Sequence, residues 1–166
     1  LPHRCRTGDL PVMRSGFIAS ACGGIALVLT ACETMQMAQS EPAPAALPAD
    51  VEIAAPGDDV PADVAAFLGV WEGDWGGRLD GKLAVERVTA DGEAHAIYAW
   101  GGGVDGLEAG RADAEGTISD GQLVLDEFPS GARAVYELQD DGTLEGTYTN
   151  PEGRSTGGLF FKAGTS

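Results

Sequence analysis

Apolar and polar residues alternate along most of the chain from Val64 onward, in short runs separated by turns. Trp71 and Trp75 share one face of such a run, while Glu72 and Asp74 share the other. This period of two is typical of antiparallel strands that have one face in a core and one in water. It predicts eight strands: Val70–Gly76, Lys82–Thr89, Glu93–Trp100, Ala112–Ile118, Gln122–Phe128, Ala132–Gln139, Thr143–Thr149 and Thr156–Lys162.

Turn signals separate these runs, because a tight hairpin needs a positive φ angle that Gly adopts freely. Helical character is confined to Pro61–Leu68, which Gly69 ends. About one hundred residues of sequential strands, without crossover helices, predict an all-β fold, a small antiparallel up-and-down barrel of about eight strands. A β-sandwich is the alternative. The hairpin signals are Asp80-Gly81, Asp91-Gly92, Asp120-Gly121 and Asp141-Gly142.

The N-terminal part has a different pattern, an apolar run from Gly16 to Leu29 after Arg14. It is short for a membrane-spanning helix and is interrupted by two glycines, which favours a cleaved leader over a spanning or buried helix. The segment Leu29-Thr30-Ala31-Cys32 closely resembles the lipobox of bacterial lipoproteins. In that family the leader is removed before the cysteine, whose thiol receives a diacylglycerol and whose amine receives a fatty acid such as palmitate.

This resemblance implies a signal peptide over residues 1–31, with its start at Met13, and lipidation at Cys32. The expected location is the cell envelope, anchored on the periplasmic face of the inner or the outer membrane. Residues 32–62 are rich in Pro and Ala, which predicts a disordered tether. An edge strand at Val51–Ile53 is the alternative within it. The β domain is expected over residues 63–166.

Charge and cysteine content narrow the function classes. Residues 1–31 hold three of the ten basic residues and one of the 26 acidic ones, so the remainder has 25 acidic and seven basic residues. Nucleic acid is therefore excluded as an expected partner. Cys5 and Cys22 lie in the leader and Cys32 is assigned to lipid, which leaves no cysteine for a disulfide or a metal. No cofactor and no metal site are expected.

The first predicted strand carries the segment Gly69-Val70-Trp71-Glu72-Gly73-Asp74-Trp75. It resembles the opening Gly-x-Trp signature of the calycin group, which includes the lipocalins, fatty-acid-binding proteins and avidins. The resemblance implies that Gly69, Trp71, Gly73 and Trp75 form a structural motif and that Trp71 closes one end of a barrel. In lipocalins a basic residue covers this tryptophan, and Arg154 is the candidate here.

The remaining chemistry favours binding over catalysis. His95 alternates with Ile97 within a strand, where a structural role is expected, so an enzyme is not expected and a hydrolase is a minor alternative. Tyr98 and Trp100 share the face opposite Ile97 and precede a glycine-rich loop, and are the candidate ligand-binding residues. Core packing is expected for the other aromatic residues of the strands, which are Trp71, Trp75, Phe128, Tyr136, Tyr148 and Phe161.

Two functions remain open. The first is a small-molecule binding module for an apolar or aromatic ligand. The second is an interaction, inhibitor or accessory domain for an envelope protein, with a filled barrel. A hollow interior would favour the first.

Overall fold

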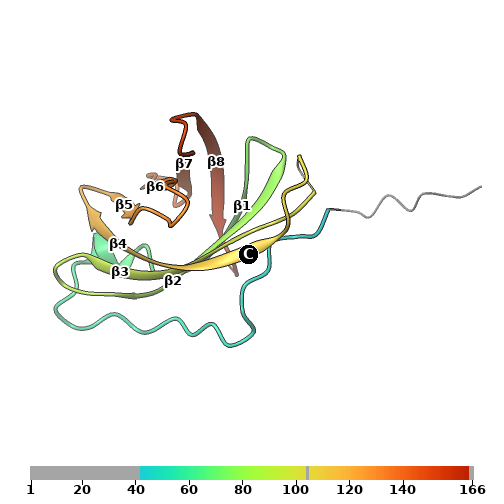
Figure 1. Cartoon of the computed structure of the whole chain (residues 1–166). Helices are drawn as coiled ribbons and strands as arrows, with labels where there is room; N and C mark the ends of the chain where they lie inside the picture. The colour runs from blue at the N-terminus through green and yellow to red at the C-terminus, as the bar shows by residue number, and fades with distance from the viewer. Residues whose placement is uncertain (1–41, 104, 165–166) are drawn as a thin grey trace, which may run out of the picture. The chain divides into compact units, whose positions relative to one another are not determined.

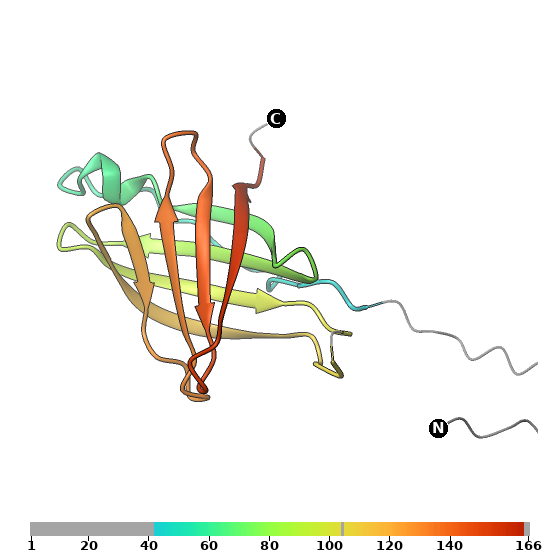
Figure 2. The same cartoon turned by 90° about the horizontal axis from the view of Figure 1, so that it is seen from above.

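The computed structural model describes residues 42–103 and 105–164. From Gly69 onward the chain forms a closed barrel of eight antiparallel strands joined in chain order (Figures 1 and 2). Each strand pairs with the next, and the last pairs with the first. This confirms the predicted all-β fold, is consistent with a calycin-like barrel, and excludes the sandwich. The strands are β1 (Gly69–Trp75), β2 (Leu79–Val88), β3 (Glu93–Trp100), β4 (Gly110–Ser119), β5 (Gln122–Leu125), β6 (Arg133–Leu138), β7 (Leu144–Thr149) and β8 (Ser155–Lys162).

One end of the barrel is filled and covered. The helix α1 (Ala62–Ala65) is shorter than the predicted segment and leads into Phe67 and Leu68, which are buried in the core. Trp71 is buried beside them, and its indole Nε1 donates a 2.8 Å hydrogen bond to the carbonyl oxygen of Phe67. Trp71 therefore closes this end of the barrel, as the Gly-x-Trp resemblance implies.

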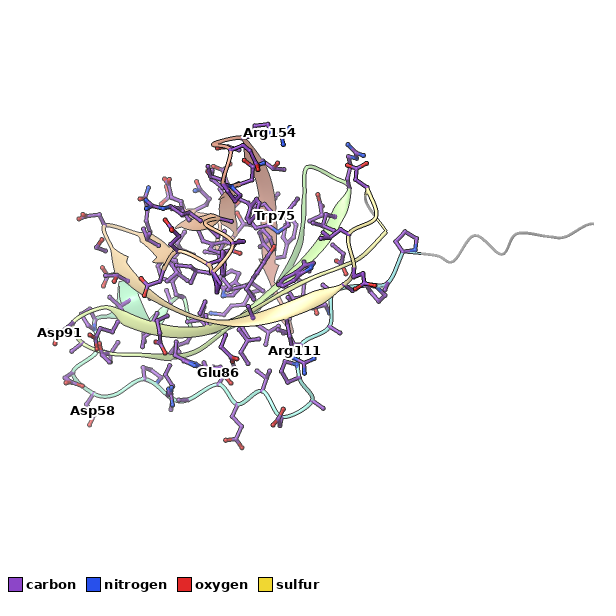
Figure 3. All side chains as sticks on the ribbon, viewed as in Figure 1. Asp58, Trp75, Glu86, Asp91, Arg111 and Arg154 are labelled. Atoms are coloured by element: carbon purple, nitrogen blue, oxygen red, sulfur yellow. The ribbon has the colours of Figure 1, made fainter. Side chains whose placement is uncertain are left out.

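The basic residue over Trp71 is Lys162 of β8, so the assignment of Arg154 was wrong. Lys162 Nζ lies 5.0 Å from the centre of the Trp71 ring and donates a 3.0 Å hydrogen bond to the carbonyl oxygen of Ala66. Gly69, at φ +131°, leaves room for the aliphatic stem of this lysine. Arg154 is exposed at the β7–β8 turn, 3.8 Å from Glu152 (Figure 3).

Three of the four Asp-Gly hairpin signals mark turns, and Asp80-Gly81 does not. Asp120 and Gly121 both have positive φ in the β4–β5 turn. The β1–β2 turn instead contains Gly76 and Gly77, at φ 63° and 68°, so β2 begins before Asp80. Gly81 is extended within β2 and faces Trp75, for a packing reason given below.

Residues 42–60 form no helix or strand, and Val51–Ile53 add no strand to the barrel. The segment nevertheless attaches to the outside of the barrel along β2 (Figure 1). Ala45 N donates a 2.8 Å hydrogen bond to Asp80 Oδ2, and Ala54 N donates one of 2.8 Å to the carbonyl oxygen of Glu86. Glu86 lies at an irregularity in the β2–β3 register, which leaves its carbonyl available.

This segment accounts for an unusual feature of the outer face. Ala84, Ile97 and Ala99 point away from the barrel interior and yet are buried. The part of the predicted tether from residue 42 onward is therefore packed on the barrel. The predicted leader, Cys32 and the first part of the tether lie outside the described residues. In the described ranges, no helix has the length and apolar character needed to cross a bilayer.

Candidate functional site

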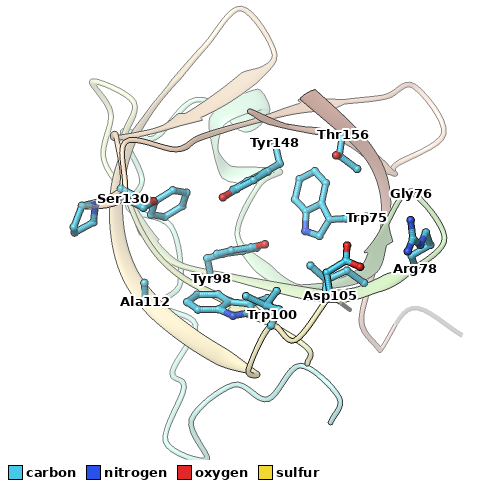
Figure 4. Close-up of a pocket in the computed structure, with 14 residues that line it drawn as sticks. Trp75, Gly76, Arg78, Tyr98, Trp100, Asp105, Ala112, Ser130, Tyr148 and Thr156 are labelled. Atoms are coloured by element: carbon cyan, nitrogen blue, oxygen red, sulfur yellow. The ribbon is translucent and has the colours of Figure 1, made fainter. Parts of the chain in front are cut away.

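The end of the barrel opposite Trp71 is hollow, with a cavity of about 690 Å³ that opens to solvent (Figure 4). Proteins commonly bind small organic molecules in cavities of this size. Most of the lining is apolar, and much of it is aromatic. The lining residues are Trp75, Gly76, Arg78, Leu79, Tyr98, Trp100, Asp105, Leu107, Ala112, Phe128, Pro129, Ser130, Tyr148 and Thr156.

Aromatic rings form one wall of the cavity. Tyr98 and Trp100 stack, with ring centres 5.6 Å apart and planes at 30°. Phe128, from the segment between β5 and β6, extends this wall at 5.8 Å from Tyr98. Residues 98 and 100 both face inward because the β period is two. One wall is thus a continuous surface of ring faces and edges.

Trp75 forms the floor between the hollow end and the filled end. Its ring centre lies 5.0 Å from that of Phe160 and 5.9 Å from that of Tyr136, both fully buried. It also lies 6.4 Å from Tyr98 and 6.0 Å from Tyr148, which line the cavity. Figure 4 shows Trp75 inside the ring of strands. The core below therefore fixes the position of the cavity floor.

Glycines make room for the Trp75 indole. A Cβ atom would lie 3.0 Å from Nε1 at Gly81, 2.7 Å from Cη2 at Gly146 and 2.8 Å from Cε3 at Gly158. These glycines belong to β2, β7 and β8. Any side chain at these positions would push Trp75 or its strand away. This is why Gly81 stands in a strand although the preceding Asp suggests a turn.

The loop between β3 and β4 forms part of the mouth and is tied to its surroundings. Trp100 Nε1 donates a 2.9 Å hydrogen bond to the carbonyl oxygen of Glu108, and Gly103 N donates one of 2.8 Å to Leu107. Gly102 N donates a 2.7 Å hydrogen bond to the carbonyl oxygen of Ala43. The segment that begins at residue 42 is therefore held beside the mouth.

The polar groups near the cavity are few and mostly uncharged. Burial raises the pKa of Tyr98 well above its ordinary value; the nearby indole N–H of Trp75 opposes this shift, and Tyr148 adds to it. Tyr98 therefore stays a neutral hydroxyl at physiological pH. Arg78 is the one basic residue of the lining, and Asp105 is the one acidic residue.

His95 lies outside the cavity, on the outer face of β3. Its Nδ1 is 2.9 Å from Glu86 Oε2, and its Nε2 is 3.8 Å from Glu115 Oε1. It therefore lies between carboxylates of β2 and β4 on the outside of the sheet, away from the cavity. In the described residues, no group of three His, Cys, Asp or Glu side chains is arranged to hold a metal ion.

The structure brings both sequence-predicted binding residues, Tyr98 and Trp100, to the same cavity wall. The expectation of core packing is correct for Trp71, Trp75 and Tyr136, which are buried in the core. Phe128 and Tyr148 are partly buried against the core and also line the cavity. The expectation was wrong for Phe161, which is 56% exposed on the outside. Phe128 lies beyond the end of the short strand β5, in a loop. Its inward position therefore could not be predicted from the alternation of apolar and polar residues.

No protein-family model matches the chain, and no curated protein matches it in sequence.

Proposed function

We propose that this protein is a lipid-anchored binding protein of the cell envelope, whose barrel holds a small apolar or aromatic molecule in its open end. The observation that carries the proposal is the cavity, which is aromatic, of ligand size and closed below by Trp75. A barrel of eight strands has room for one small ligand when its interior is not filled by side chains. Here the side chains that fill the closed half of the barrel pack under Trp75 and hold the floor of the cavity in place.

The anchor is supported by the lipobox resemblance of Leu29-Thr30-Ala31-Cys32. Residues 33–41 separate Cys32 from Pro42, and a chain of that length spans at most about 35 Å. Ala43 and Ala45 attach at the mouth end of the barrel.

Tryptophan fluorescence tests ligand binding, because the chain has three tryptophans in three environments. Compounds that enter the cavity should quench Trp75 and Trp100 saturably. Trp100→Phe should remove part of this quenching, whereas Trp71→Phe, at the closed end, should preserve it. Ala112→Phe adds bulk to the cavity wall and should weaken binding at least tenfold.

A second function, recognition of an envelope protein, is favoured by two apolar side chains on the outside of β8. Leu159 and Phe161 are 42% and 56% exposed. They share the outer face with Glu72, Asp74 and Glu145 of the neighbouring strands. If no apolar or aromatic compound quenches saturably, and an envelope protein co-purifies with the wild type but not with Phe161→Ser, this second function replaces the first.

A further inference from the structure

The two tyrosines of the cavity stand on opposite walls. Tyr98 belongs to β3 and Tyr148 to β7, and these strands are four positions apart in a closed ring of eight. Figure 4 shows Tyr148 across the open space from Tyr98, with Trp100 behind Tyr98. The centres of both tyrosine rings lie close to that of Trp75, at 6.4 Å and 6.0 Å, so Trp75 closes the space between them at the cavity floor.

The space between these two facing walls is called the slot. The stacked pair of Tyr98 and Trp100 presents a flat surface, and the Tyr148 ring lies on the other side of the slot. Flat aromatic molecules gain offset-stacked contact with such walls, about 0.5–1.5 kcal/mol for each ring pair beyond the area buried. An acyl chain gains only the area term.

The charge around the slot favours a cation over an anion. The chain has 26 acidic and ten basic residues, and Asp105 lies at the mouth. The faces of Tyr and Trp rings carry negative potential and attract cations. Arg78, at the rim, opposes this preference, but one guanidinium is set against a strongly acidic chain and five cavity-lining rings.

We propose that the cavity takes planar aromatic molecules, cationic ones in preference to anionic ones, between the facing rings of Tyr98 and Tyr148. This inference rests on the proposed binding function and specifies its ligand class. It also assigns distinct roles to the two tyrosines, since each supplies one wall of the slot.

Four probes vary the shape and the charge of the ligand separately. Proflavine is a planar cation and anthracene-9-carboxylate a planar anion, whereas decyltrimethylammonium is a cation with an alkyl chain and laurate an anion with an alkyl chain. Binding is measured by titration calorimetry in about 0.1 M salt, where charges within roughly 10 Å of the ligand still act on it. Proflavine should bind at least tenfold more tightly than each of the other probes. Tyr148→Leu should weaken proflavine binding at least tenfold, and Tyr148→Phe should restore most of it.

Each other result has a definite meaning. If decyltrimethylammonium or laurate binds and proflavine does not, the ligand class is wrong while the binding function stands. Equal binding of proflavine and anthracene-9-carboxylate would refute the charge preference. Proflavine binding that is unchanged in Tyr148→Leu lies outside the slot and overturns the inference. If no probe binds and the wider apolar panel also fails to quench Trp75 and Trp100, the proposed function itself fails.

Discussion

The indole ring of Trp75 packs directly on Gly158, where a Cβ atom would lie 2.8 Å from the ring carbon Cε3. The same added atom would lie 2.6 Å from the carbonyl oxygen of Asp74, across the β1–β8 pairing. The absence of a side chain at Gly158 therefore allows Trp75 to pack at the cavity floor, and it also allows β8 to pair closely with β1 where the barrel closes.

Gly158→Ala should lower the free energy of unfolding by about 1–3 kcal/mol, the usual range for overpacking, because backbone as well as side chain must shift. Gly157→Ala is the matched control, since a Cβ at this neighbouring position has open space, 4.0 Å from its nearest atom. Its effect should stay within about 0.5 kcal/mol. Urea denaturation measures both. Equal losses would show that Trp75 does not rest on Gly158.

Trp71→Ala should cost about 3–5 kcal/mol, as expected for a large buried ring, and also remove the support of the Phe67 carbonyl. Glu72→Ala, on the exposed face, should cost less than about 1 kcal/mol even though Glu72 Oε1 lies 2.6 Å from Lys82 Nζ. Urea midpoints of the two variants check this difference. A similar loss in both would mean that the two faces of β1 are assigned wrongly.

Removal of residues 1–41 from the chain should leave the unfolding free energy of the barrel nearly unchanged. Removal of residues 1–55 should lower it by roughly 1–3 kcal/mol, because Ala84, Ile97 and Ala99 lose their cover. The hydrogen bonds from Ala45 and Ala54 are lost as well. Thermal unfolding of the two truncated proteins gives the comparison. Identical midpoints would show that the segment along β2 adds nothing to stability.

The barrel should lose stability as the pH rises above about 10, the ordinary pKa of tyrosine. Burial raises the pKa of both Tyr98 and Tyr136, so the unfolded chain releases these protons before the folded one does. The stabilisation is complete below that pH and is lost above it, by up to about 1.4 kcal/mol per pH unit for each tyrosine.

Tyr136→Phe should make this alkaline loss shallower. The comparison cancels the contribution of Lys162, whose pKa is lowered by burial and whose effect has the opposite sign. Urea midpoints over a range from about pH 8 to about pH 11 measure the slope. Parallel slopes for the variant and the wild type would argue against a buried neutral Tyr136.

Cys32→Ser should abolish both lipidation and cleavage after Ala31, because in the lipoprotein hypothesis the Cys32 thiol accepts the diacylglycerol. Cys22→Ser, within the predicted leader, is the control and should be processed like the wild type. Mass spectrometry of the mature N-terminus decides. A wild-type protein that begins at Glu33, or with an unmodified cysteine, would refute the anchor.

The alternation of side chains was sufficient to predict the barrel and most of its strands, since period-two burial is a local property of each strand. Tyr98 and Trp100 could be placed near an opening in the same way, because both face inward just before a glycine-rich loop. The Gly-x-Trp segment likewise indicated that Trp71 is buried.

Other features depended on contacts between distant segments. Lys162, rather than Arg154, covers Trp71 because strand closure brings the end of β8 beside β1. Gly81, Gly146 and Gly158 look like turn or spacer residues in sequence, and only the folded barrel brings them together around one indole. Tyr148 lines the cavity opposite Tyr98 because barrel closure places β7 opposite β3. The sequence by itself determined which side chains point inward in most strands, with the exception of β8, where Phe160 rather than Phe161 is buried. The tertiary structure decided which end of the barrel is filled, because filling depends on side chains that meet only after the sheet closes.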